Sequence, residues 1–111
     1  MKPGVRAEQL AAQYLQQRGL TMVQANFRCR FGEIDLIMHD GKTLVFVEVR
    51  QRSSNDFGGA LASIDRRKQQ RIILAAQFYL SSLPHTPPCR FDAVLLDASG
   101  NIEWIMNAFE A

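Results

Sequence analysis

Three carboxylates stand among strongly apolar residues in the segment GEIDLIMHDGKTLVFVEVR, residues 32–50. The pattern predicts two strands, residues 32–39 and 43–51, that form a hairpin. Side chains alternate along a strand, so Glu33 and Asp35 share one face of the first strand. The opposite face of that strand is assigned Ile34, Leu36 and Met38. On the second strand, Glu48 shares a face with Phe46 and Arg50.

The dipeptide Asp40-Gly41 suits a two-residue hairpin loop, and this choice of loop fixes how the strands pair. In that register Asp35 faces Phe46, Glu33 faces Glu48, and Asp35 is a diagonal neighbour of Glu48. All three acids then project from the same face of the sheet. A slip of one residue would reverse the parity and separate them.

Like charges that meet on a sheet are destabilising by a few tenths to about 1 kcal/mol per pair, so something must offset their repulsion. Mg²⁺ is one solution, since it takes oxygen ligands and commonly binds one or two carboxylates together with substrate phosphates. Arg50 lies on the same face as Glu48 and could hold a phosphate oxygen or stabilise developing negative charge. The group therefore favours metal-assisted attack of water on a phosphodiester.

Two questions about these acids remain open at this point. Arg28, Arg30 and Arg50 could simply pair with the acids across the sheet, which would make the group structural. Glu8 stands beside the apolar stripe of a predicted N-terminal helix. It could reach a metal on the sheet or be an ordinary surface acid.

Basic residues gather near the same region, although the formal net charge of +2 does not by itself indicate a partner. Eight of the thirteen Lys and Arg residues form this group: Arg28, Arg30, Arg50, Arg52, Arg66, Arg67, Lys68 and Arg71. They form a candidate patch for phosphate, with a solvated surface as the alternative. Contacts of this kind read the nucleic-acid backbone, so they imply a preference for structure more than for sequence.

The totals describe an ordinary globular protein, with 111 residues, 47% of them hydrophobic and 22% charged. This length predicts one domain, residues 1–111, whose core buries roughly 65% of the surface of the unfolded chain. No apolar run approaches the ~20 residues of a membrane span, and no signal-peptide pattern opens the chain, so we expect a cytoplasmic protein. Cys29 and Cys89 are expected to be reduced there. A zinc site formed by these two cysteines with His39 and His85 is disfavoured, because zinc sites usually show two compact ligand pairs.

The remaining elements complete an α/β pattern in the order α-β-β-β-α-β-β. A helix over 3–18 ends at Gly19, and a strand follows over 21–30. After a polar loop over 53–60, Ser63 is placed to cap a second helix that runs to about residue 82, with Asp65 in its first turn. Strands over 90–97 and 102–109 close the chain around the turn Ser99-Gly100-Asn101. The stretch between the third and fourth strands is long enough for a crossover, which favours a mixed five-stranded sheet flanked by helices.

Several motifs together carry a resemblance to a known family. They are AE at 7–8, GEIDLI, VFVEVR.R, FG.A, K..RI..AA..YL and RFD, and they extend over roughly residues 4–97. In this combination the chain resembles the YraN-like family of small bacterial proteins of uncharacterised function. That family is similar in turn to the PD-(D/E)XK nuclease superfamily, particularly the archaeal Holliday-junction resolvases. The resemblance implies a restriction-endonuclease-like core, a metal site on the central hairpin, Mg²⁺ or Mn²⁺ as cofactor and DNA as partner.

Carried over by position, the resemblance implies that Glu8 is the acid of the first helix and that Asp35 and Glu48 bind the metal. The backbone carbonyl of Val49 would be a further metal ligand. Arg50 stands where the superfamily motif has lysine. Arginine stays protonated, so it can stabilise charge but cannot act as a general base by shedding a proton. Lys68 is a possible substitute for that lysine.

Three functional hypotheses follow. The first is a Mg²⁺- or Mn²⁺-dependent DNA endonuclease, with Arg28, Arg30, Arg52, Arg66, Lys68 and Arg71 as candidate nucleic-acid contacts. The second is a nucleic-acid-binding module that has kept the fold and lost the chemistry, which Arg50 favours. The third is a protein-interaction domain whose acids pair with arginines. A homodimer would match the two-fold symmetry of a DNA junction, but no residue indicates an interface.

Overall fold

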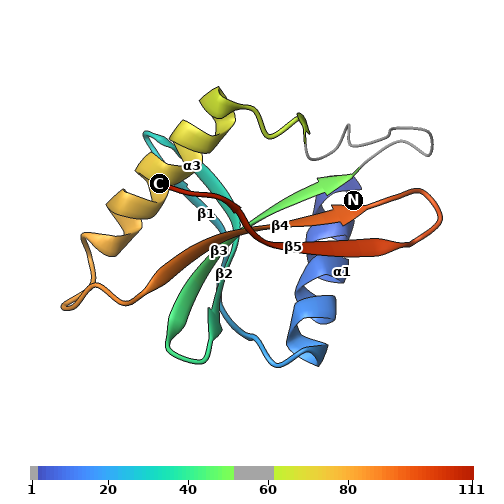
Figure 1. Cartoon of the computed structure of the whole chain (residues 1–111), viewed down its shortest axis with the longest axis horizontal. Coiled ribbons are helices and arrows are strands. Elements are labelled where there is room, and N and C mark those ends of the chain that lie inside the picture. Colours follow the sequence, from blue (N-terminus) through green and yellow to red (C-terminus); the bar gives the residue numbers. More distant parts are fainter. Residues whose placement is uncertain (1–2, 52–61) are drawn as a thin grey trace.

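The computed structural model describes residues 3–51 and 62–111 of the chain (Figure 1). Within these residues, two helices and five strands follow one another in the predicted order, which confirms the α/β class. Their bounds are α1 (Pro3–Gln17), β1 (Thr21–Cys29), β2 (Gly32–Asp40), β3 (Thr43–Gln51), α3 (Arg66–Leu80), β4 (Cys89–Leu96) and β5 (Ile102–Phe109). The loop predicted over 53–60 lies outside the described residues, as does Arg52. No helix in the described part of the chain is long and apolar enough to cross a membrane.

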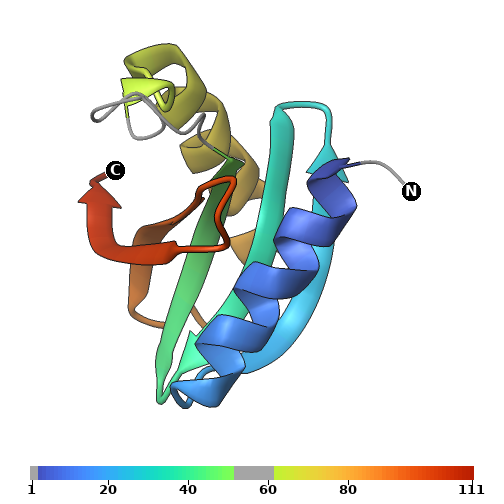
Figure 2. The ribbon, with the colours of Figure 1, turned by 90° about the vertical axis from the view of Figure 1, so that its right-hand side faces the viewer.

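The strands form one mixed sheet in the order β1-β2-β3-β4-β5. Neighbouring strands are antiparallel except β3 and β4, which are parallel because the chain returns through α3 before it enters β4. Helices α1 and α3 lie on opposite faces of the sheet (Figure 2). The central strands are therefore covered on both sides.

Each helix packs on its own apolar cluster. Under α3 lie Ile37, Leu44, Phe46, Phe91 and Leu95, and the rings of Phe46 and Phe91 are stacked with 5.5 Å between their centroids. Under α1 lie Leu36, Met38, Val45, Val47 and Val94. This division follows the predicted alternation along β2 and β3, except at Ile34.

The hairpin between β2 and β3 differs from its predicted register. Asp40 pairs with Thr43, so the loop is Gly41-Lys42 and not Asp40-Gly41. Gly41 has φ 61°, which suits the first central position of a two-residue turn that glycine favours. Each residue of β2 consequently pairs two positions further along β3 than predicted. The parity is unchanged, so the same side chains still share a face.

A second departure occurs where β1 passes the acids of β2. Ala25 pairs with Leu36 and Phe27 with Ile34, but the Asn26–Asp35 pair between them is missing from the ladder. Asn26 has φ 55°, a left-handed conformation that asparagine tolerates better than most residues. At this irregularity Ile34 packs with the cluster under α3. The prediction that Ile34 shares a face with Leu36 and Met38 was therefore wrong.

The start of α3 also corrects a prediction. The N-cap is Asp65, whose side chain accepts a hydrogen bond of 2.8 Å from the backbone N–H of Lys68. Ser63, the predicted cap, lies two residues earlier. The helix ends at Leu80, two residues before the predicted end. Asp65 makes the better cap because its carboxylate accepts from the third residue of the helix and also opposes the positive end of the helix dipole.

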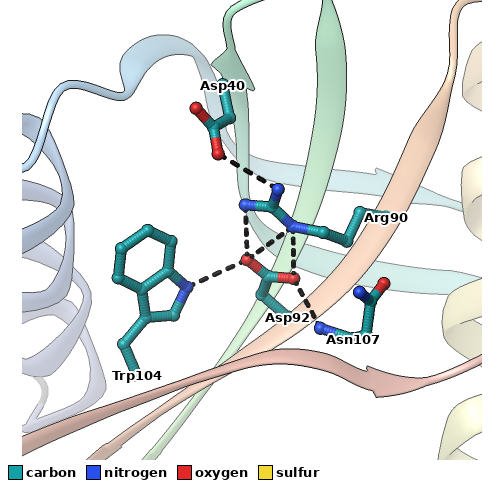
Figure 3. Close-up of polar contacts among 5 residues, drawn as sticks. All are labelled: Asp40, Arg90, Asp92, Trp104 and Asn107. Atoms are coloured by element: carbon teal, nitrogen blue, oxygen red, sulfur yellow. Dashed lines mark hydrogen bonds and ion pairs between the residues drawn. The ribbon is translucent and has the colours of Figure 1, made fainter.

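A buried network of polar side chains joins β4 to its neighbours in the sheet (Figure 3). Asp92 on β4 is fully buried and accepts hydrogen bonds from the Arg90 guanidinium, from Trp104 Nε1 at 2.9 Å and from the Asn107 backbone N–H at 3.1 Å. Arg90 also lies 3.0 Å from an Asp40 carboxylate oxygen. The network links β4 to β5 and to the end of β2, so Asp92 is structural.

Candidate functional site

Asp35 and Glu48 form the centre of the site. The β2–β3 ladder ends at Leu36–Val47, and Asp35 and Glu48 are the next residues on the two strands, where their carboxyl groups hydrogen-bond. The backbone N–H of Val49 donates to Asp35 Oδ2 at 2.8 Å and holds this carboxylate in place. The predicted convergence of these two acids is therefore observed, in a register that differs from the predicted one by two positions.

Glu48 is only 5% exposed, and its surroundings do not favour a charge. Burial is the largest cause that raises the pKa of Glu48 to about 9, followed by the hydrogen bond and the charge of Asp35. Lys68 and Arg50 act in the opposite direction but do not outweigh these effects. At neutral pH the Glu48 carboxyl group therefore retains its proton.

Glu8 brings α1 into the site. Its carboxyl group hydrogen-bonds both Asp35 and the Asn26 side chain. Burial and then the charge of Asp35 raise the pKa of Glu8, while the Asn26 contact lowers it. Of the two alternatives left open for Glu8, a side chain that reaches the sheet is the one that these contacts favour. Asn26 was not predicted, because an exposed asparagine in a strand carries no signal of its own.

Glu33, by contrast, lies to one side of the pair. Its carboxylate is 3.3 Å from Arg28 Nε, and about half of its side chain is exposed. This contact supports the alternative of an ion pair for Glu33 alone. Glu33 still lines the site cavity, so it is the outermost of the acids.

The acids line a cavity of about 480 Å³ where α1, the β2–β3 hairpin and α3 meet. Its charged lining consists of Glu8, Glu33, Asp35, Glu48, Arg50 and Lys68, and Val49 also contributes. The predicted hairpin and N-terminal helix account for most of this lining. No pattern in the sequence gives a geometric reason for α3 to supply Lys68.

Lys68, near the start of α3, lies with its Nζ 3.7 Å from Glu48 Oε2. Arg50 comes from β3 itself, and its Nη2 donates a long hydrogen bond of 3.5 Å to the Ser63 carbonyl. The buried Nε of Arg50 has no hydrogen-bond partner among the described residues. The cavity therefore holds one ammonium beside the buried acid and one guanidinium with a spare donor.

The donor set suits a hard divalent cation that completes its shell with water and phosphate. Among residues 3–51 and 62–111, no three His, Cys, Asp or Glu side chains are arranged to hold a metal ion by themselves. Mg²⁺ does not require such a cage, since it commonly uses one or two carboxylates and retains several waters. The buried Glu48 and the half-buried Asp35, whose carboxyl groups lie together, fit that need. The zinc set of Cys29, His39, His85 and Cys89 is not brought together in this part of the chain.

The basic residues divide into three groups. Arg28, Lys68 and Arg71 line a second cavity of about 330 Å³, which adjoins the first because Glu33 and Lys68 line both. The Arg30 guanidinium lies over the ring of Phe31, 4.8 Å from its centroid. Arg66 is exposed at the first turn of α3, and the predicted contact Arg52 lies outside the described residues.

Comparisons with known proteins agree on one family. Residues 7–96 match the uncharacterised protein family UPF0102. A UPF0102 protein of Nitrosomonas europaea is 59% identical, over 96% of this chain and 92% of its own length. A relative from Dechloromonas aromatica is 58% identical, over 97% of this chain and 88% of its own length. On the extent of these matches, the chain belongs to the uncharacterised protein family UPF0102.

Proposed function

We propose that this protein is a Mg²⁺- or Mn²⁺-dependent endonuclease that hydrolyses DNA phosphodiester bonds, with branched or otherwise structured DNA as its substrate. The observation that carries the proposal is the buried Glu48, with its raised pKa, against the half-buried Asp35 in a cavity that Glu8, Arg50 and Lys68 also line. The resemblance to the PD-(D/E)XK superfamily and its Holliday-junction resolvases points to the same chemistry.

The roles follow from the positions of the side chains. Asp35, Glu48 and the carbonyl of Val49 would hold the cation. A bound cation would polarise the phosphate and lower the pKa of the attacking water. Glu8 hydrogen-bonds Asp35 from the α1 side and can accept a proton from that water.

The task of the missing motif lysine divides between two residues. Lys68 places an ammonium beside Glu48 and, unlike arginine, can exchange a proton. Arg50 has a spare Nε donor that can bind a phosphate oxygen and stabilise its charge in the transition state. On this assignment the lysine has moved from the strand to α3 in the fold, and Arg50 does not prevent catalysis.

The second candidate function is a nucleic-acid-binding module that does not cleave, and arginine at position 50 is the observation that favours it. The two candidates differ in a direct assay. Labelled linear, flapped and four-way DNA is incubated with Mg²⁺ or Mn²⁺ and with wild type, Asp35→Asn, Glu48→Gln or Lys68→Met. We expect metal-dependent cleavage by wild type and a loss of about 100-fold or more in each variant.

Glu110→Gln is the matched control, since it also removes one carboxylate but lies near the C-terminus, outside the site. It should cleave like wild type. Absence of cleavage by wild type on every substrate, with DNA binding that weakens as salt rises, would establish the binding module instead.

A further inference from the structure

The cavity beside the acids has the composition of a phosphate site. Three cations line it, Arg28, Lys68 and Arg71, against one carboxylate, Glu33. That carboxylate is already paired with Arg28. The cavity lies between the β1–β2 turn and α3, and it joins the acid site through Glu33 and Lys68. A phosphate held here would be close to the phosphodiester at the acids.

Gly32 allows the turn to lie this close to α3. A Cβ at this position would come 3.2 Å from the Arg71 carbonyl oxygen and 3.3 Å from Arg71 Cβ, and side chains rarely adopt its φ of 157°. The close approach and the backbone conformation therefore both favour glycine. It fixes the wall of the cavity that carries Arg71.

An exposed apolar ledge continues from this cavity along α3. Phe78 is 43% exposed and Leu74 is 40% exposed, and with Arg71 they share one face of the helix at spacings of three and seven residues. The ring of Phe31, from the β1–β2 turn, lies 5.9 Å from the ring of Phe78. The Arg30 guanidinium lies over Phe31. We call Phe31, Leu74 and Phe78 the aromatic ledge.

We propose that the basic cavity and the aromatic ledge together bind an unpaired nucleotide of the DNA, with its phosphate among Arg28, Lys68 and Arg71 and its base against Phe31 and Phe78. This inference rests on the proposed function for the identity of the polymer as nucleic acid. Cations beside exposed aromatic rings are the combination with which proteins bind single strands, because the cations bind the backbone and the rings stack on bases. In a duplex the bases are stacked on one another and cannot reach the ledge. The substrate would therefore carry a single-stranded segment next to the bond that is cut.

Binding without cleavage gives the first test. Fluorescent DNAs are titrated with protein in metal-free buffer: a blunt duplex, the same duplex with a single-stranded arm, and a duplex with an RNA arm. We expect tighter binding to the arm than to the blunt duplex. Phe31→Ala and Phe78→Ala should each weaken binding of the arm about ten-fold and leave binding of the blunt duplex unchanged.

Two further variants separate stacking from packing at the same position. Phe31→Leu keeps an apolar side chain of similar reach but cannot stack, so it should behave like Phe31→Ala. Phe31→Trp should bind the arm at least as tightly as wild type. Met106→Ala is the control outside the ledge, since Met106 on β5 is 50% exposed and apolar, and it should change nothing.

The two cysteines give an independent measure of DNA binding in the wild-type protein. Cys29 lines the basic cavity, whereas Cys89 is exposed and lines a separate cavity at the start of β4. DNA with an arm should slow alkylation of Cys29 by iodoacetamide and leave the rate at Cys89 unchanged. Equal protection of both thiols, or of neither, would contradict binding in this cavity.

The outcomes distinguish this inference from the proposed cleavage. Ledge-dependent binding of the arm without any cleavage would uphold the nucleotide site and overturn the nuclease. Metal-dependent cleavage with no effect of Phe31→Ala or Phe78→Ala on arm binding would uphold the nuclease and overturn the nucleotide site. Equal weakening of arm and blunt duplex would also overturn it, and no binding to any DNA would overturn both. A preference for the RNA arm would keep the site and change the polymer.

Discussion

Two buried carboxyl groups in this molecule have opposite kinds of hydrogen-bond partners. Asp92 is fully buried, and Arg90, Trp104 and Asn107 all donate hydrogen bonds to it. Glu48 is 5% exposed, yet its hydrogen-bond partner is a second carboxyl group and the nearest ammonium is 3.7 Å away. A buried charge is costly unless it is paired and hydrogen-bonded. Asp92 meets this requirement through its three donors, whereas Glu48 faces another acid and retains a proton at neutral pH.

The effect on the neighbouring groups shows the same contrast. The hydrogen bond to Asp92 is the largest cause that raises the pKa of Arg90, so Asp92 favours the charged form of Arg90. At the second site, burial and then Asp35 raise the pKa of Glu48, so both oppose the charged form of Glu48. We call Asp92 and its donors the closed network, which stabilises the fold. We call Asp35 and Glu48 the open pair, which is suited to binding.

The largest expected loss of stability follows from disruption of the closed network. Asp92→Ala removes the acceptor and leaves the Arg90 guanidinium without its main partner in a largely buried position. Removal of one partner of a buried pair typically costs 3–5 kcal/mol, so we expect a loss of about 4 kcal/mol in the free energy of unfolding by urea. Asp92→Asn keeps an acceptor for Trp104 and should lose less. A loss below about 1 kcal/mol in Asp92→Ala would show that the network does not support the fold.

The second prediction concerns the open pair and its dependence on pH. A carboxyl group with a pKa raised in the folded state binds more protons folded than unfolded, so stability falls as pH rises from its unfolded pKa to its folded one. For Glu48 that window runs from 4.5 to about 9. Metal-free wild type should therefore lose stability across this range, with a slope of at most about 1.4 kcal/mol per pH unit.

Glu48→Gln keeps the shape and cannot ionise, so it should flatten this dependence in urea titrations at a series of pH values. A smaller slope of the same sign should remain, because the pKa of Glu8 is also raised. Glu110→Gln is the control and should retain the wild-type slope. An unchanged slope in Glu48→Gln would mean that Glu48 does not hold the proton.

Much of this comparison was visible in the sequence, because alternation alone assigns side chains to faces. The predicted β2–β3 loop begins one residue before the observed loop, so each residue of β2 pairs two positions further along β3 than predicted. The carboxyl groups of Asp35 and Glu48 nevertheless meet, since a shift of two preserves parity up to the end of the ladder at Leu36–Val47. The order of the elements was predictable for the same reason, from the periods of the apolar residues.

Other features depend on tertiary packing and have no local signal. Lys68 reaches Glu48 only because α3 packs on the face of the sheet that carries the acids. The irregularity at Asn26, which redirects Ile34, depends on pairing between β1 and β2. Trp104 and Asn107 are partners of Asp92 only through the pairing of β4 with β5.

The smallest expected change in stability is the gain on binding of a cation to the Asp35–Glu48 pair. A ligand that binds only the folded state stabilises it by RT ln(1 + [L]/Kd), so Mg²⁺ or Mn²⁺ at ten times its dissociation constant should add about 1.4 kcal/mol. This gain is measured as a rise in the midpoint of thermal or urea unfolding at pH 8, without DNA. Asp35→Asn and Glu48→Gln should each abolish the rise, whereas Asp92→Asn, which alters the closed network, should retain it. If wild type gains nothing, or if the gain survives in both site variants, the acid pair is not the cation site.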